Sequence, residues 1–255
     1  MLWLSPKSAP RGSSLVYLDI SHGGEIYRIG LRRLASAQRY TLRVRAAKQE
    51  IILTMPARGS LKEAKCFAAK HAAWIGARLR RLPQRIPFGD GKIVPLRGIL
   101  HTITHRAASR GAVWVEAAAD CDGSTPLLCA GGDALFVERR IKDYFLSEAK
   151  KDIEAAVIRY AQQVGVSPRR ISLRDPVSRW GSCSSSGALS FSWRLILAPP
   201  FVLDYLAAHE IAHLLHMNHS KLFWEAVERL TTDTRRAEAW LKTQGSGLHR
   251  FGPDP

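Results

Sequence analysis

The segment from Pro199 to His219 constrains the fold of this chain more than any other. It begins with two prolines, which a first helical turn tolerates, and continues with good helix formers and no further glycine or proline as far as residue 216. We therefore predict one helix over residues 199–216. His209 and His213 are four residues apart, so their imidazoles project from one face of this helix, close enough to bind one metal ion.

A catalytic zinc site takes three protein ligands and leaves the fourth position to water, so a third ligand is needed. At 1.5 Å per residue, His216 would lie about 10.5 Å along the helix axis from His209, too far to share an ion with it. Asn218 tolerates the left-handed conformation that ends helices, and a turn there returns His219 toward the metal. We predict one Zn²⁺ ion held by His209, His213 and His219.

Glu210 is adjacent to the first histidine and is placed to reach a metal-bound water rather than the metal itself. A zinc ion held by three histidines lowers the pKa of its water toward about 7, and Glu210 then takes the proton and delivers it to the leaving group. Ser220 is placed to cap a following helix over residues 221–230, which would pack behind the site. These residues predict a hydrolytic metal centre with Glu210 as the general base.

The first half of the chain contains short alternating or apolar stretches rich in β-branched and aromatic residues. These stretches predict strands of a small antiparallel sheet at 15–18, 40–44 and 51–54. Ser60 and Glu63 form a capping box, and the apolar spacing after them predicts one helix from about 61 to 81.

Further strands are expected within residues 92–104 and 112–117, followed by a loop over 118–132. Asp133 is placed to cap a long helix whose apolar residues keep helical spacing until Gly165. The fold class is therefore α+β. We divide the chain into three parts: an N-terminal tail and first strand (1–26), a basic β-rich region with one helix (27–130), and a catalytic region (131–255) that is either separate from 27–130 or continuous with it.

The net charge of +16 is concentrated near the start of the chain, where residues 1–100 carry 19 Lys+Arg against 5 Asp+Glu. A clustered positive field attracts nucleic acid, nucleotides, anionic membranes or acidic protein segments. The alternative is a solvated basic surface that aids solubility, and no recognisable nucleic-acid motif accompanies the charge.

No signal-peptide core and no run of membrane-spanning length is found in the sequence, so we expect a cytoplasmic protein. The four cysteines, Cys66, Cys121, Cys129 and Cys183, form no C-x-x-C pair, which suits reduced thiols. A bridge between Cys121 and Cys129 stays open.

Three motifs follow one another in the second half of the chain. They are Arg179 to Ser184, Leu189 to Pro199, and the His-Glu-x-x-His of 209–213 with residues 218–224. In this order they resemble the YgjP-like metallopeptidases, relatives of the SprT-like and WLM zinc proteases. With weaker likeness at Trp74 and Trp240, the resemblance covers roughly residues 27–242.

The spacing of the three histidines is also that of the metzincins. Here, however, His216 occupies the place of the metzincin glycine, and no methionine follows Met217 to supply their Met-turn. The metzincin family therefore fits poorly.

The resemblance implies a zincin-like core with an active-site helix, with His209, His213 and His219 as ligands and Glu210 as base. Residues 189–197 alternate like a half-buried strand, and in zincins such a strand borders the cleft and pairs with an extended substrate. Other candidates to contact substrate or support a ligand are Arg179, Ser182, Arg194, Tyr205 and His216. For Trp180, packing in the core is an equal alternative, whereas for Tyr205 a packed core position and for Cys183 a small buried position are favoured.

The function that follows is peptide-bond hydrolysis, with a polypeptide as substrate. One alternative is a zinc hydrolase acting on a nucleotide or another phosphate ester, because the basic excess could hold phosphates. Another is a nucleic-acid or protein-binding module with a non-catalytic metal. An intact Glu210 argues against a purely structural metal, since structural sites close the fourth position with a protein ligand.

Overall fold

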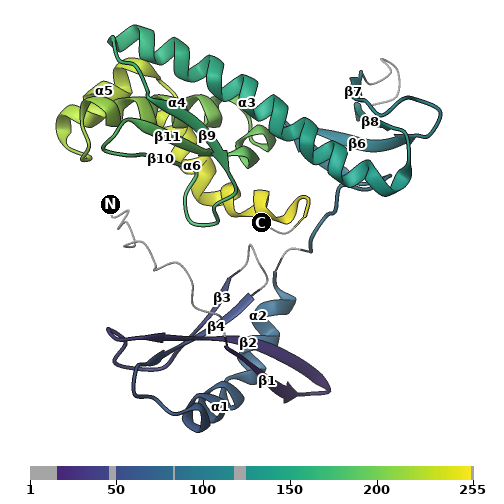
Figure 1. Ribbon diagram of the computed structural model, residues 1–255, viewed down its shortest axis with the longest axis vertical. Coiled ribbons are helices and arrows are strands. Elements are labelled where there is room, and N and C mark those ends of the chain that lie inside the picture. Colours follow the sequence, from purple (N-terminus) through teal and green to yellow (C-terminus); the bar gives the residue numbers. More distant parts are fainter. Residues whose placement is uncertain (1–15, 46–49, 83, 118–124, 254–255) are drawn as a thin grey trace. The chain divides into compact units, whose positions relative to one another are not determined.

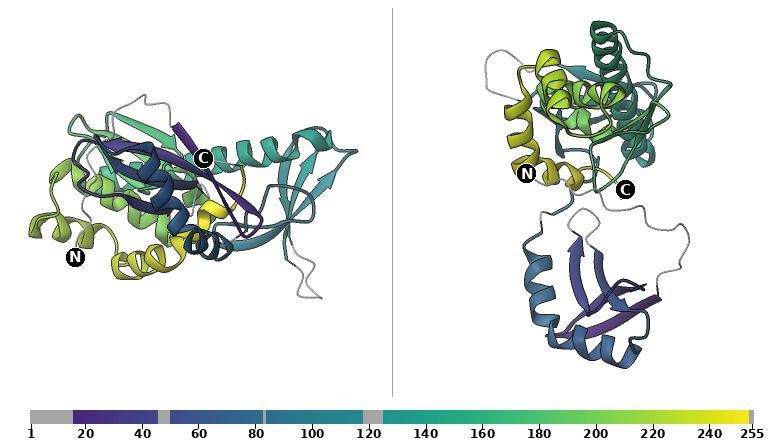
Figure 2. Two further views of the ribbon diagram at one scale, coloured as in Figure 1. Left: turned by 90° about the horizontal axis from the view of Figure 1, so that it is seen from below. Right: turned by 90° about the vertical axis from the view of Figure 1, so that its left-hand side faces the viewer.

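The chain forms two compact units, Met1–Leu82 and Pro83–Pro255, each with its own hydrophobic core (Figures 1 and 2). The computed structural model describes residues 16–45, 50–82, 84–117 and 125–253. The sequence left open whether residues 131–255 are separate from 27–130 or continuous with them; by its internal contacts the chain divides after Leu82. The reason is that Val94, Ile103 and Leu128 pack in the same core as the helices that follow them.

The first unit is built on a four-stranded sheet in the order β1-β2-β4-β3. Its strands are β1 (Val16–His22), β2 (Glu25–Leu34), β3 (Thr41–Arg45) and β4 (Glu50–Pro56). The outer pairs are antiparallel, but β2 and β4 run parallel, so the sheet is mixed and not antiparallel as the sequence predicted. One face packs through Ile29, Leu53 and Met55 onto the two helices of this unit.

The single helix predicted over 61–81 is two helices, α1 (Leu61–Lys70) and α2 (Ala72–Arg80), interrupted at His71. The capping box is present: the Ser60 side chain accepts a hydrogen bond from the backbone N–H of Glu63, whose carboxylate accepts one from the Ser60 N–H. The change of direction at His71 lets both helices bury small residues against one sheet (Figure 1).

The second unit begins with a four-stranded sheet in the order β5-β6-β8-β7. The strands are β5 (Ile93–Leu96), β6 (Ile99–Arg106), β7 (Val113–Glu116) and β8 (Leu127–Gly131). β8 falls in the stretch predicted as a loop, of which residues 118–124 lie outside the described residues. Leu128 and Ala130 are fully buried, so the short apolar run at 127–130 was the signal for this strand.

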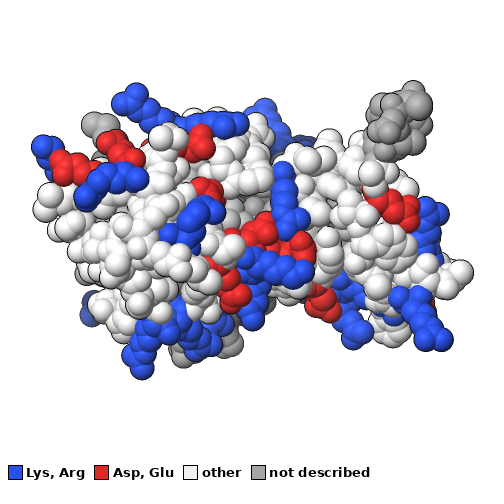
Figure 3. Space-filling model, turned by 90° about the horizontal axis from the view of Figure 1, so that it is seen from above, with Lys and Arg blue, Asp and Glu red and all other residues white. Residues whose placement is uncertain are grey.

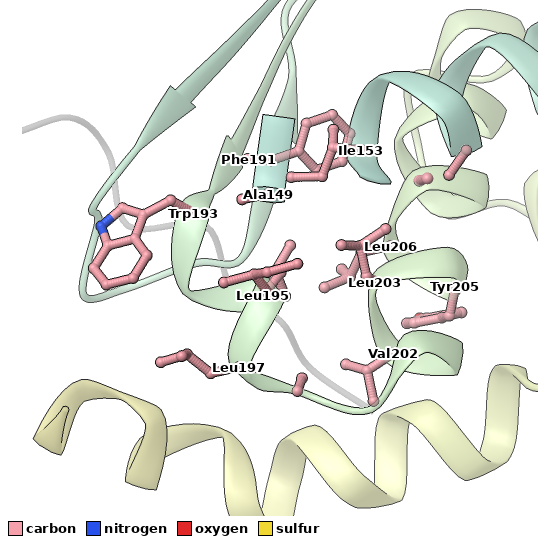
Figure 4. Close-up of a cluster of buried hydrophobic side chains, with 14 of the residues drawn as sticks. Ala149, Ile153, Phe191, Trp193, Leu195, Leu197, Val202, Leu203, Tyr205 and Leu206 are labelled. Carbon is pink, nitrogen blue, oxygen red and sulfur yellow. The ribbon is translucent and has the colours of Figure 1, made fainter. Parts of the chain in front are cut away.

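A long helix leads from this sheet into the rest of the unit. Asp133 caps the 3-10 turn η2 (Ala134–Phe136), and α3 (Val137–Val164) follows directly. α3 ends as predicted at Gly165, which has a left-handed φ of 69°. Figure 4 shows Ala149 and Ile153 of α3 meeting Phe191, Leu195 and Leu206, which belong to the elements that position the site.

A three-stranded sheet in the order β10-β11-β9 carries the motif residues 181–192. Its strands are β9 (Arg170–Arg174), β10 (Gly181–Cys183) and β11 (Ala188–Ser192). The strand predicted over 189–197 ends at Ser192, which caps the 3-10 helix η3 (Trp193–Leu197) through a hydrogen bond from the Arg194 N–H. All five η3 side chains are buried, so the alternating sequence pattern does not correspond to one buried and one exposed face. In the sheet order β11 is the central strand, and β10 and β9 are the edge strands.

The remaining helices are α4 (Pro200–Leu215), α5 (Lys221–Leu230), α6 (Thr234–Gln244) and the 3-10 helix η4 (Gly245–Arg250). α4 and the Ser220 cap of α5 lie where the sequence predicted them. None of the helices in the described part of the chain combines the length and apolar composition needed to span a bilayer.

Candidate metal centre

Three histidine side chains converge at the end of α4. His209 and His213 lie one turn apart on the helix, and the turn after Leu215 returns His219 toward them. Each offers one ring nitrogen, and these nitrogens all lie within 4.8 Å of one another. The Nε2 atoms of His209 and His219 are 3.3 Å apart. The three nitrogens could hold one metal ion.

Hydrogen bonds at Nδ1 orient the imidazoles of His209 and His213. Nδ1 of His213 lies 3.2 Å from the backbone oxygen of His216, a pure acceptor, so Nδ1 carries the proton and Nε2 is left with its lone pair. Nδ1 of His209 lies 3.4 Å from the Tyr205 hydroxyl, which donates to Oε1 of Glu238 on α6 at 3.1 Å. Such contacts fix the tautomer and orientation of metal-ligating histidines.

The surroundings of His209 and His213 favour the neutral form of both imidazoles. Burial, reinforced by the neighbouring His213 and His219, lowers the pKa of His209 to about 3. Burial also lowers the pKa of His213. A neutral imidazole keeps the lone pair that a metal ligand needs, so the environment of these side chains fits a bound cation.

Glu210 is buried, with 4% of its surface exposed, and its Oε2 has no hydrogen-bond partner among the described residues. Burial raises the pKa of Glu210 to about 8, although the charge of Arg179 acts to lower it. A buried carboxylate oxygen without a partner is costly and calls for a ligand or a water. Beside three convergent imidazoles, this oxygen fits a site that holds a metal and a reacting water.

β10 lies against α4, and Gly181 approaches the Glu210 carboxylate closely. Cys183 is two residues further along β10, so strand alternation places it on the same side as Gly181, and the charge of Arg179, which precedes the strand, acts on Glu210. Consistently, the Glu210 charge helps burial to raise the pKa of Cys183 to about 11. Ser182 alternates to the opposite side, away from Glu210.

The structure also places two other residues that the sequence suggested for the site, His216 and Arg194. His216 caps α4 and meets the cluster only through its backbone oxygen. Arg194 is fully buried: its guanidinium pairs with Asp175 at 2.7 and 3.0 Å and donates to the backbone oxygens of Leu248, Phe251 and Pro253. Of the two roles expected for Arg194, contact with a substrate or support of a ligand, direct contact does not fit this complete burial.

Sequence reasoning missed Glu238 and the approach of Gly181 to Glu210. Both contacts join residues of different elements that are 29 or more positions apart, so no local spacing in the sequence predicts them. The rings of Phe223 and Trp224 also lie against His209, with centroids 4.9 and 6.0 Å away. They were expected only as part of a helix behind the site.

Three convergent imidazoles beside a buried carboxylate form the donor set of metal-dependent hydrolases. The comparison with known families narrows this class. The chain matches the family model described as YgjP-like, metallopeptidase domain, over residues 38–244, and it belongs to that family. At the family level it is a metallopeptidase.

A solved structure, that of the metallopeptidase zymogen of Pyrococcus abyssi abylysin, is similar to part of the chain. Its TM-score is 0.33 at 19% sequence identity, and the match covers 36% of this chain and 95% of that one. No curated protein matches the chain.

Proposed function

We propose that the chain is a zinc peptidase whose metal is held by His209, His213 and His219. The observation that carries the proposal is the convergence of three histidine nitrogens within 4.8 Å, next to a buried carboxylate oxygen that has no partner in the described structure. Family membership supplies the reaction class.

When bound, Zn²⁺ supplies Lewis acidity, which activates water and polarises the scissile carbonyl. Glu210 performs the proton transfers: Oε2 takes a proton from the attacking water and returns it to the amide nitrogen as the C–N bond breaks. Its burial keeps bulk water from competing for this proton. Arg179 is exposed just before β10, its charge acts on Glu210, and we assign it to substrate binding.

The edge of β10 is the surface on which we place an extended polypeptide. The Trp180 oxygen accepts a hydrogen bond from the Ser192 N–H, and the Ser184 N–H donates to the Ala188 oxygen. By antiparallel geometry, the backbone polar groups of Gly181 and Cys183 then point away from β11. A peptide strand can pair with these groups and pass beside Glu210.

Product analysis tests the proposal. Zinc-loaded protein is incubated with an unfolded polypeptide and, separately, with nucleotides, and the products are identified by mass spectrometry. We expect new amino and carboxyl termini from the polypeptide and no released phosphate. Phosphate release without peptide cleavage would establish the phosphate-ester alternative and overturn the proposal.

The support of His209 by Tyr205 can be tested separately. Tyr205→Phe removes the hydroxyl between His209 and Glu238 and is expected to weaken zinc affinity about 10-fold, as losses of such supporting contacts do. Competition against a chromogenic chelator measures this. Tyr160→Phe is the matched control, because the Tyr160 hydroxyl also bonds a carboxylate, that of Asp204, but touches none of the three histidines. Equal zinc affinity in Tyr205→Phe and the wild type contradicts this role.

A second candidate function concerns the first unit, which carries 16 Lys+Arg against 4 Asp+Glu. The second unit is nearly balanced, with 22 against 18. There the signs are interspersed, as in the pairing of Arg97 with Glu148 and Asp152, and both signs recur across the face in Figure 3. The excess of positive charge is therefore a property of the first unit.

Part of this charge gathers on the sheet face opposite α1 and α2, here called the open sheet face. Its residues alternate with those that pack on the helices. They include Tyr17, Arg28, Arg32, Arg43 and Arg45. Arg28 and Arg45 pair with Asp19 and Glu50, whereas Arg32 and Arg43 have no acidic partner among the described residues.

We infer that the open sheet face binds single-stranded nucleic acid. Unpaired guanidiniums match phosphate groups, and Tyr17, 53% exposed on the same face, can stack on a base. In this proposal nucleic-acid binding belongs to the first unit, and it does not exclude a metal centre in the second unit.

The double variant Arg32→Ala/Arg43→Ala is expected to weaken oligonucleotide binding and to reduce the slope of log K against log salt by about 1.4, since each single-strand phosphate contact adds about 0.7. Fluorescence anisotropy at several salt concentrations measures the slope. Arg78→Ala on α2 removes charge from the helical side and serves as control. An unchanged slope in the double variant, or binding to anionic vesicles but not to the oligonucleotide, contradicts the assignment.

A further inference from the structure

We propose that Gly181 is a positioning residue that sets the place of the Glu210 carboxylate. The inference rests on the proposed role of Glu210 as base, and it assigns to the Arg-Trp-Gly-Ser-Cys segment a task in the reaction. Three observations carry it: the distance between the two residues, the absence of any conformational need for glycine, and the fixed surroundings on both sides.

A side chain at this position would have to displace the Glu210 carboxylate. A Cβ added to Gly181 would lie 2.4 Å from Oε1 of Glu210 and 2.9 Å from its Cδ and Cγ. Non-bonded carbon and oxygen atoms do not approach this closely. The backbone of β10 therefore rests directly on the carboxylate.

Glycine is not needed here for its backbone freedom. Gly181 lies within a regular strand and is not among the residues with positive φ, unlike Gly165 or Gly187. A larger residue could adopt the same backbone conformation. The reason for glycine at 181 is the space that Glu210 occupies.

Neither partner can move aside freely. β10 is tied to β11 by backbone hydrogen bonds on both sides of Gly181, and Trp180 stacks on His249 with ring centroids 5.1 Å apart. Glu210 lies on the rigid helix α4, next to His209, and is almost completely buried. Oε2 has no hydrogen-bond partner among the described residues, and the close approach of β10 limits where the carboxylate can lie.

The rate of the reaction depends on the position of the Glu210 carboxylate. A general base must lie within hydrogen-bond reach of the proton it takes, and a misplacement of about 1 Å can cost about 100-fold in rate. A methyl group at 181 displaces the carboxylate while leaving the three histidines in place. The expected signature is a fall in kcat with little change in KM and with zinc still bound.

Gly181→Ala is therefore expected to lower kcat about 100-fold and to retain zinc affinity. Gly247→Ala is the matched control, since a Cβ there meets no atom within 4 Å and the φ of Gly247 is not positive. Wild-type kcat in Gly181→Ala would overturn the inference. If the wild type itself cleaves nothing when loaded with zinc, the proposed function fails, and the stability experiment below still decides whether the contact exists.

A double-mutant cycle on thermal stability separates this contact from general damage to the strand. In the wild-type background Gly181→Ala is expected to lower Tm by about 5 °C, as overpacking of a buried contact does. In the Glu210→Ala background, where the carboxylate is gone, the same substitution should leave Tm within about 1 °C. An equal loss of Tm in both backgrounds means that the added methyl group meets other atoms, and the inference is then wrong.

Discussion

Replacing His213 with alanine is expected to remove the bound zinc and to abolish peptide cleavage. Its imidazole supplies one of the three nitrogens of the cluster, and its Nδ1 is already committed to the His216 oxygen, so Nε2 is the atom that is lost. Metal content after dialysis, measured by mass spectrometry, should fall from about one zinc per chain to a trace.

His216→Ala is the matched control for this prediction. It deletes an imidazole three residues away but keeps the backbone oxygen that orients His213, so zinc content should stay at the wild-type level. A ligand that binds only the folded state raises stability by about 2.7 kcal/mol at 100 times its Kd. Zinc should therefore raise the Tm of the wild type and of His216→Ala but not of His213→Ala. Equal zinc content in His213→Ala and the wild type contradicts the ligand assignment.

Glu210→Gln is expected to lower the rate of cleavage about 1000-fold while leaving zinc bound, because loss of a general base typically costs 100- to 10,000-fold. The amide is nearly the same size as the carboxylate, so the close packing under β10 is kept. It cannot, however, take a proton from water. Steady-state kinetics on a peptide substrate, with zinc content measured on the same samples, give the result.

Glu228→Gln removes one negative charge from an exposed position on α5 and controls for the change in charge. Its rate should equal that of the wild type. Full activity in Glu210→Gln would show that another group moves the proton, and the mechanism given above would have to be abandoned.

The cluster could be predicted from the sequence because its geometry is local. His209 and His213 need only helical spacing, and His219 needs only one turn after the helix, so eleven residues define all three positions. The same is true of the Ser60 and Ser220 caps and of the Gly165 helix end, each of which depends on residues within one helical turn.

What the sequence could not supply depends on contacts between distant elements. Alternation over 189–197 suggested a strand with Arg194 on its polar side, but η3 is buried all round and Arg194 pairs inside with Asp175. The strand edge beside Glu210 belongs to β10. This strand has only three residues, too few for an alternating hydrophobic pattern to be detected in the sequence. The division of the chain after Leu82 follows likewise from shared burial, because the sheet of β5 to β8 joins the second core.

The most direct test of the account is a titration of the metal-free protein with zinc while the rate of peptide cleavage is followed. With three histidines forming one site, the rate should rise linearly and level off at about one zinc per chain, and Glu210→Gln should bind the same amount without gaining activity. Cleavage that proceeds at full rate without zinc, or a Glu210→Gln variant that gains wild-type activity on loading, would contradict it.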